Sequence, residues 1–341
     1  MDSPDTFGPG RLRGLERIAT PEGVFAMCAM DHRGSLQRMI DAEAPKRVTY
    51  QAMVEEKLRL CEALAPDSSA VLLDPIYGAS QCLARGALPR QTGLLISLEA
   101  TGYEGTSDRR RTKLLEGWSP HKARMLGADA AKLLVYFHPD RTEEASYQLN
   151  VIGEAAQACA GADIPFLVEA VAYAIDGASK DSAAFAAERP RIVLESARQI
   201  TALPIDILKA EFPADLRHER DDGRMLDLCR ELSEASPVPW VVLSAGVNYE
   251  QFRRQVELAC RGGASGFLAG RAIWQEAFDL EPARRGAFLK TTAVERLREL
   301  RDIAVRHATP WQQRSRHRYP SLDHLSESWY RAYGTQEGPK R

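Results

Sequence analysis

Eight short, strongly apolar segments recur along the chain and alternate with longer stretches in which apolar and charged residues mix. The apolar segments cover residues 25–30, 70–74, 93–97, 130–136, 165–170, 205–210, 240–244 and 265–270. Their near-continuous apolarity is typical of strands that are covered on both faces of a parallel sheet. Helical patterns over 49–64, 192–200 and 249–260 lie between them, the second after Pro190 and the third after the candidate cap Asn248. Eight such units predict an α/β protein with a closed (β/α)8 TIM barrel.

An open, doubly wound sheet is the alternative architecture for the same alternation. It is less favoured, because no GxGxxG motif follows the first strand to mark a dinucleotide site. A chain of 341 residues suits one barrel with elaborated ends. We expect the barrel over residues 1–308 and a C-terminal helical extension over residues 309–341 that packs on it.

Composition excludes several classes of partner. A formal net charge of −2 with 27% charged residues gives no basic footprint for nucleic acid. No stretch approaches the length of a membrane span, and the N-terminal residues lack a signal-like apolar segment, so we expect a cytoplasmic protein without a membrane partner. The six cysteines are scattered and the seven histidines form no HxH group, which favours buried cysteines and no metal or other cofactor.

Lys209 is the residue whose position is hardest to explain by packing, because it interrupts the apolar run DILKAEFP at 206–213. Lysine is almost never fully buried unless it is paired. One interpretation is a structural ion pair, and the other is a nucleophilic amine that forms a Schiff base with a carbonyl. Lys132 and Glu169 interrupt two other strands in the same way, and this convergence favours a site.

The predicted catalytic group consists of Lys209, Glu169, Lys132 and Asp31, which lie in or just after four strands. An amine attacks a carbonyl only when it is unprotonated, and a second cation nearby disfavours its protonated form. We expect Lys132 to act on Lys209 in this way. Glu169 would shuttle protons, and Asp31 would orient a water or a hydroxyl group.

The last two strands run into glycine turns, LSAGVN and GFLAGRAIW. A simple glycine turn explains either loop alone, but the phosphate site of TIM barrels commonly follows strands seven and eight. Backbone N–H groups and a helix N-terminus there would hold a phosphate. The predicted phosphate-binding residues are Ser244, Gly246, Gly270 and Arg271.

Long polar segments follow the third, fifth and sixth strands, at 104–120, 173–190 and 214–224. In a barrel these segments lie at the end where active sites form. They are either lids and substrate walls or solvated insertions.

Seven segments in the same order resemble the class I tagatose 1,6-bisphosphate aldolase family, the LacD-like branch of Schiff-base aldolases. They are AMDHRGSL, EATGYEG, KLLVYFHPD, PFLVEAV, DILKAEFP, LSAGVN and GFLAGRAIW. The resemblance covers about residues 25–274 and implies a barrel that cleaves a ketose bisphosphate to dihydroxyacetone phosphate and glyceraldehyde 3-phosphate without a metal. It also implies that Lys209 is the Schiff-base lysine, Glu169 the acid/base group, and Lys132 and Asp31 their supporting pair.

Two departures from the family pattern concern substrate recognition. His32 stands where glutamine is common, and Ala100 replaces a lysine of the third-strand motif. The related sulfofructose-1-phosphate aldolases share the lysine chemistry and are the alternative within the enzyme class. A non-catalytic sugar-phosphate sensor on the same barrel is the alternative outside it. The partner we expect is a small sugar phosphate, and the aromatic C-terminal segment suggests a homo-oligomer.

Overall fold

The computed structural model describes residues 8–316 and 327–333. Eight parallel strands close into a barrel in the order β1-β10-β9-β8-β7-β6-β3-β2. Their bounds are β1 Phe25–Ala29, β2 Ala70–Leu73, β3 Gly93–Ser97, β6 Ala130–Tyr136, β7 Phe166–Val171, β8 Ile207–Ala210, β9 Trp240–Val242 and β10 Gly266–Ala269. Each falls within one of the eight apolar segments, except that β7 extends one residue further, so the predicted TIM barrel is confirmed.

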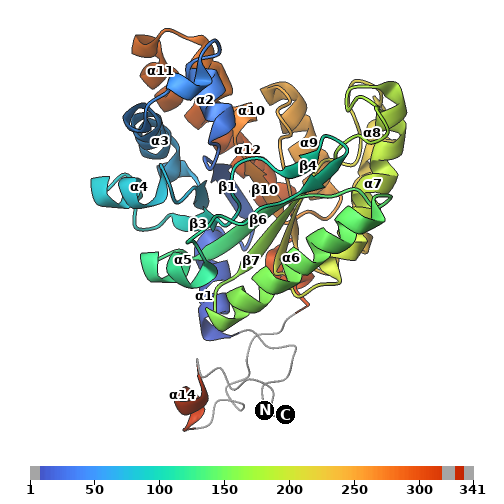
Figure 1. The fold of residues 1–341 in the computed structure, drawn as a ribbon, viewed down its shortest axis with the longest axis horizontal. Helices are drawn as coiled ribbons and strands as arrows, with labels where there is room; N and C mark the ends of the chain where they lie inside the picture. Colours follow the sequence, from blue (N-terminus) through green and yellow to red (C-terminus); the bar gives the residue numbers. More distant parts are fainter. Residues whose placement is uncertain (1–7, 317–326, 334–341) are drawn as a thin grey trace.

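Helices surround the barrel and cover the outer face of the strands (Figure 1). The helices are α1 Pro9–Ile18, α2 Gly34–Ile40, α3 Tyr50–Leu64, α4 Ala79–Arg85, α5 Pro120–Leu126, α6 Thr142–Gly161, α7 Ala183–Thr201, α8 Asp222–Ala235, α9 Tyr249–Arg261, α10 Arg271–Trp274, α11 Pro282–Phe288, α12 Val294–His307, α13 Trp311–Arg314 and α14 Trp329–Ala332. No helix in the described part of the chain is long and apolar enough to cross a membrane.

Side-chain caps explain where several helices begin. The Thr49 hydroxyl accepts a hydrogen bond from Ala52 N at 3.2 Å, and the predicted cap Asn248 accepts one from Gln251 N at 2.9 Å. Such caps satisfy N–H groups that have no partner inside the helix.

The helix predicted over 192–200 begins earlier than expected, at Ala183, because Ser182 caps it through Phe185 N at 3.1 Å. Pro190 therefore lies inside α7 rather than before it. A proline there removes one backbone hydrogen bond of the helix, but the cap and the buried face of α7 outweigh that loss.

Two apolar cores follow from the alternation of side chains along the strands. One lies between the strands and the helices, and the other fills the barrel with residues such as Phe25, Met27, Leu95 and Ile207. Leu15 and Ile18 of α1 join the inner core, so α1 closes the barrel at the N-terminal end of its strands (Figure 1). At the opposite end of the barrel, where the strands have their C-termini, the interior is lined by polar side chains.

The start of the predicted C-terminal extension contacts the barrel. Trp311 of α13 is buried in the inner core, and its backbone N–H donates to Gly23 O at 2.9 Å. Arg316 donates to the carbonyl oxygens of Thr201 and Leu203 at 2.5 and 3.0 Å. Residues 317–326 and 334–341 of the extension lie outside the described residues.

Candidate active site

Because side chains alternate in direction along a strand, three charged side chains point into the barrel. Ala130, Leu167 and Ile207 belong to the inner core, and the residues two positions later on β6, β7 and β8 are Lys132, Glu169 and Lys209. Side chains two apart on a strand share a face. All three therefore lie above the apolar filling of the barrel, and the register places Glu169 directly beside Lys209.

Lys132 lies at the centre of a cluster of carboxylates. Its Nζ is 2.9 Å from Asp31 Oδ2, 2.6 Å from Glu99 Oε1 and 2.9 Å from Glu169 Oε2. An ammonium group has three N–H donors, so each proton has one carboxylate acceptor. The side chain of Lys132 is 1% exposed, and this full pairing offsets the large desolvation cost of a buried charge.

The cluster fixes the charge state of its members. Burial alone would lower the pKa of Lys132, but the carboxylates of Asp31, Glu169 and Glu99 raise it well above its ordinary value. Burial would raise the pKa of both Asp31 and Glu169, yet Lys132 and, with a smaller effect, Lys209 hold both pKa values below the ordinary range. At neutral pH Lys132 is therefore a cation, and these two carboxylates are anions.

Glu169 links the two lysines. Its second oxygen, Oε1, lies 2.8 Å from Lys209 Nζ, so one carboxylate bridges Lys132 and the predicted nucleophile. Lys132 was expected to act on Lys209 as a repelling cation. In the structure three carboxylates surround that charge, and the group in contact with Lys209 is the carboxylate of Glu169.

The four predicted phosphate-binding residues gather at the ends of β9 and β10. Ser244 is buried just after β9, Gly270 follows β10, and Arg271 is the first residue of α10. Gly246 adopts φ +80°, and a Cβ added there would lie 3.3 Å from Arg271 Cζ. The backbone of one loop thus packs against the guanidinium group of the other. The helix that follows Gly270, α10, is a single turn.

A cavity of about 500 Å³ connects these groups at the C-terminal end of the strands. Seven of the eight predicted site residues line it, and Gly246 instead lines an adjacent cavity of about 360 Å³. The larger cavity has six cationic and four anionic side chains in its wall: Arg33, Arg38, Lys132, Lys180, Lys209 and Arg271 against Asp31, Glu99, Glu169 and Glu211. The excess of two positive charges suits a small dianion.

Two of the long polar segments contribute to the wall of this cavity. Residues 104–106 and 109–111 form an antiparallel hairpin, β4 Glu104–Thr106 and β5 Arg109–Arg111. The Arg110 guanidinium lies 4.7 Å from the ring centre of Tyr103 and 5.5 Å from that of Tyr136, and both rings line the cavity. From the second segment, Lys180 lines it and pairs with Glu211 at 2.7 Å. Ala100 and His32, the two departures from the family pattern, line it as well.

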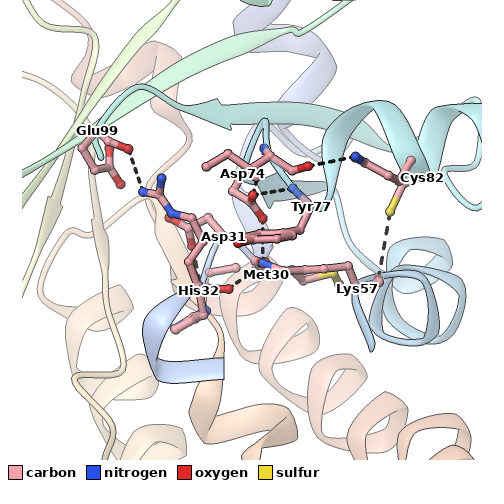
Figure 2. A network of polar contacts seen from close by, with 12 residues as sticks. Met30, Asp31, His32, Lys57, Asp74, Tyr77, Cys82 and Glu99 are labelled. Carbon is pink, nitrogen blue, oxygen red and sulfur yellow. Dashed lines mark hydrogen bonds and ion pairs between the residues drawn. The ribbon is translucent and has the colours of Figure 1, made fainter. Parts of the chain in front are cut away.

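Sequence reasoning did not assign site roles to Glu99, Lys57 or Arg33. Glu99 closes the cluster around Lys132, and Arg33 Nη2 donates to Glu99 O at 2.6 Å. Lys57 reaches from α3 to the backbone around Asp31 (Figure 2). For Lys57, the sequence did contain a sign of burial. Lys57 falls at helical spacing between the apolar residues Met53 and Leu60, on the face that α3 buries.

Comparisons with known proteins agree with this geometry. The profile of the DeoC/LacD family aldolases matches residues 25–276. The chain is 31% identical over 319 residues to the tagatose 1,6-diphosphate aldolase of Lactococcus lactis subsp. lactis, covering 88% of this chain and 97% of that protein. It is 32% identical over 320 residues to the corresponding protein of Streptococcus pneumoniae serotype 4, with the same coverage.

Solved structures share the fold at lower identity. A Schiff-base-forming fructose-1,6-bisphosphate aldolase aligns with a TM-score of 0.56 and 20% identity, over 85% of this chain and 98% of that one. The fructose-bisphosphate aldolase from Plasmodium falciparum aligns with a TM-score of 0.68 and 11% identity, over 91% and 99%. With the family profile and the curated relatives spanning most of its length, the chain belongs to the DeoC/LacD family of aldolases.

Proposed function

We propose that this protein is a class I aldolase, an aldehyde-lyase that cleaves a ketose 1,6-bisphosphate through a Schiff base on Lys209. The substrate is tagatose 1,6-bisphosphate, and the products are dihydroxyacetone phosphate and glyceraldehyde 3-phosphate. The observation that carries this proposal is the contact of Lys209 Nζ with Glu169 Oε1 at 2.8 Å, inside a cavity that also holds Arg271 and Ser244. The relatives named as tagatose 1,6-diphosphate aldolases match 88% of this chain, which supports this substrate.

The reaction begins with transfer of a proton from the Lys209 ammonium group to Glu169, which frees the amine. The amine attacks the ketone carbon, and Glu169 returns the proton to the carbonyl oxygen as the carbinolamine forms. Glu169 then takes the extra proton from the carbinolamine nitrogen and passes it to this oxygen, which leaves as water and gives the iminium ion. Lys132 keeps Glu169 and Asp31 in place throughout, because its three protons hold one carboxylate each.

Cleavage then breaks the bond between the third and fourth carbons of the sugar. Glu169, the proton-transfer group, takes the proton of the C4 hydroxyl group. The aldehyde then leaves, and the electron pair of the broken bond moves into the iminium ion to form an enamine. Asp31, across Lys132 from Glu169, orients this hydroxyl group. Protonation of the enamine and addition of the water lost earlier release dihydroxyacetone phosphate and regenerate Lys209.

Ser244, Gly246, Gly270 and Arg271 bind the phosphate group next to the ketone. Arg271 supports this role, because it makes no ion pair with any carboxylate among residues 8–316 and 327–333 and lines the cavity. A guanidinium without an acidic partner can place its N–H groups on two phosphate oxygens.

Borohydride reduction in the presence of dihydroxyacetone phosphate tests the proposal. We expect a stable adduct on the peptide that contains Lys209, and none in Lys209→Ala. Absence of an adduct with the wild-type protein, together with saturable binding of the sugar phosphate, would instead indicate the non-catalytic sensor. Turnover of sulfofructose 1-phosphate in preference to the tagatose and fructose bisphosphates would identify the sulfonate-specific alternative.

We further propose that the chain functions in cytoplasmic carbohydrate metabolism, that residues 1–308 and 309–341 form the barrel and its extension, and that the protein is a homo-oligomer. The exposed aromatic rings of Trp329, Tyr330 and Tyr333 support a subunit contact, since clustered exposed aromatic residues often mark interfaces. Light scattering after gel filtration tests the oligomer: a monomeric mass would contradict it.

A further inference from the structure

Lys57 is a buried cation outside the cluster around Lys132. Its side chain is 0% exposed, although it lies on α3, on the outer side of the barrel. Its Nζ donates to Met30 O and to His32 O, the latter at 2.6 Å, and lies 2.8 Å from Asp74 Oδ2 (Figure 2). The ammonium group thus donates to two backbone carbonyl groups and forms an ion pair with one carboxylate.

The two carbonyl groups that Lys57 binds belong to the residues on either side of Asp31. Lys57 therefore holds the peptide group that enters Asp31 and the one that leaves His32, so the backbone is fixed on both sides of Asp31, while the Asp31 side chain contacts Lys132 at 2.9 Å. Arg33, two residues after Asp31, is tied to Glu99 O at 2.6 Å.

Asp74 fixes the position of the Lys57 ammonium group. It follows β2 and is itself 0% exposed, and its Oδ1 accepts hydrogen bonds from Ile76 N and Tyr77 N at 3.0 and 2.8 Å. One oxygen of the carboxylate is thus anchored to the turn after β2, and the other contacts Lys57. A buried ion pair contributes little net stability compared with an apolar pair of similar volume, so stability alone does not explain the position of this one.

We propose that Lys57, anchored by Asp74, is a positioning residue that sets the distance between the Asp31 carboxylate and the reacting hydroxyl group. This inference rests on the role of Asp31 in the proposed function. Neither Lys57 nor Asp31's backbone takes part in bond making. The pair acts by fixing where the carboxylate lies, and a misplacement of about 1 Å at a reacting group can lower a rate about 100-fold.

The test replaces both charges together, Lys57→Met with Asp74→Asn, so that no unpaired charge is left buried. The matched control is Arg11→Met with Asp206→Asn, a second pair of a helix cation and a buried aspartate, 2.5 Å apart at the closed end of the barrel. Asp206 also accepts a backbone hydrogen bond, from Phe166 N at 2.8 Å. Thermal midpoints of both double variants are measured alongside activity.

We expect the Lys57/Asp74 variant to lose about 10- to 100-fold in kcat with KM changed by less than about threefold, because the phosphate contacts are untouched. The control retains kcat. In an Asp31→Asn background the Lys57/Asp74 replacement produces no further loss, because a residue that acts through Asp31 has nothing left to position. Double-mutant cycles of this kind separate coupled from independent effects.

Wild-type kcat in the double variant, or losses that multiply in the Asp31→Asn background, would overturn the inference. If the double variant does not fold, Asp74→Asn alone provides the test: it keeps Lys57 but removes its anchor, and the same cycle with Asp31→Asn applies. Wild-type adduct formation on Lys209 and loss of activity in Asp31→Asn are established first. A failure of the proposed function therefore appears before, and separately from, a failure of this inference.

Discussion

Replacement of Lys132 by methionine removes the cation on which three carboxylates converge. Asp31, Glu99 and Glu169 all lie within 2.9 Å of its Nζ, and the lysine side chain is 1% exposed. Removing one partner of a buried ion pair destabilises a protein by about 3–5 kcal/mol. We expect a loss of this size at pH 7.5, since Lys209 forms an ion pair with Glu169 and, among the described residues, with neither Asp31 nor Glu99.

The sign of the pH dependence follows from the carboxylates. In the wild type the pKa values of Asp31 and Glu169 are below their ordinary values, so these groups stabilise the folded state above the unfolded-state pKa near 4, and that contribution is lost as pH falls. Without Lys132, burial raises these pKa values, and the folded variant binds protons more tightly than the unfolded chain. The variant therefore gains stability as pH falls from 7.5 toward 5, and its deficit relative to the wild type shrinks.

Urea unfolding followed by tryptophan fluorescence, at pH 7.5 and pH 5, measures this deficit. The control is Lys290→Met, at an exposed lysine of the segment after α11, which we expect to change stability by less than about 0.5 kcal/mol. A deficit for Lys132→Met that is under about 1 kcal/mol, or equal at the two pH values, would refute the electrostatic account of the cluster.

Three further variants test the proposed roles by steady-state kinetics, borohydride trapping and stability measurements. Glu169→Gln removes the proton acceptor of Lys209 and should lower kcat by about 10²–10⁴-fold; a loss of less than about threefold contradicts that role. Arg271→Gln should weaken borohydride trapping of dihydroxyacetone phosphate but not that of unphosphorylated dihydroxyacetone, and equal effects on both would argue against phosphate binding. Gly246→Ala places a Cβ at φ +80° and 3.3 Å from Arg271 Cζ, so we expect about 1–2 kcal/mol lower stability and a higher KM. Gly286→Ala, at ordinary φ with open space around it, is the control, and a similar response of the two glycine variants would contradict the packing argument.

The strands and the inward direction of the lysines were predictable from sequence. Apolar runs that are buried on both sides need no long-range information, and the spacing of two residues between Ile207 and Lys209 fixes a shared face wherever Ile207 points inward. The position of the loops after β9 and β10 was predictable for a related reason, because their place in the order of strands determines which end of the barrel they occupy.

The charge balance of the site was not predictable, because it depends on contacts between distant segments. Glu99 and Lys132 are 33 residues apart, and nothing in either local sequence shows that they meet, so Lys132 was interpreted as a free repelling cation. The start of α7 was misplaced for the opposite reason. A local signal, Pro190, was given more weight than the Ser182 cap and the buried helix face.

The base of the barrel joins both halves of the chain. Leu15 and Ile18, near the start of the sequence, lie in the barrel interior. Trp311, near its end, packs in the same apolar layer, and its backbone N–H donates to Gly23 O. Closing a loop of nearly the whole chain carries a large entropic cost before that contact forms. During synthesis on a ribosome, this apolar layer therefore stays incomplete until α13 emerges, and a chain cut before Trp311 would expose part of the layer to water and to other unfinished chains.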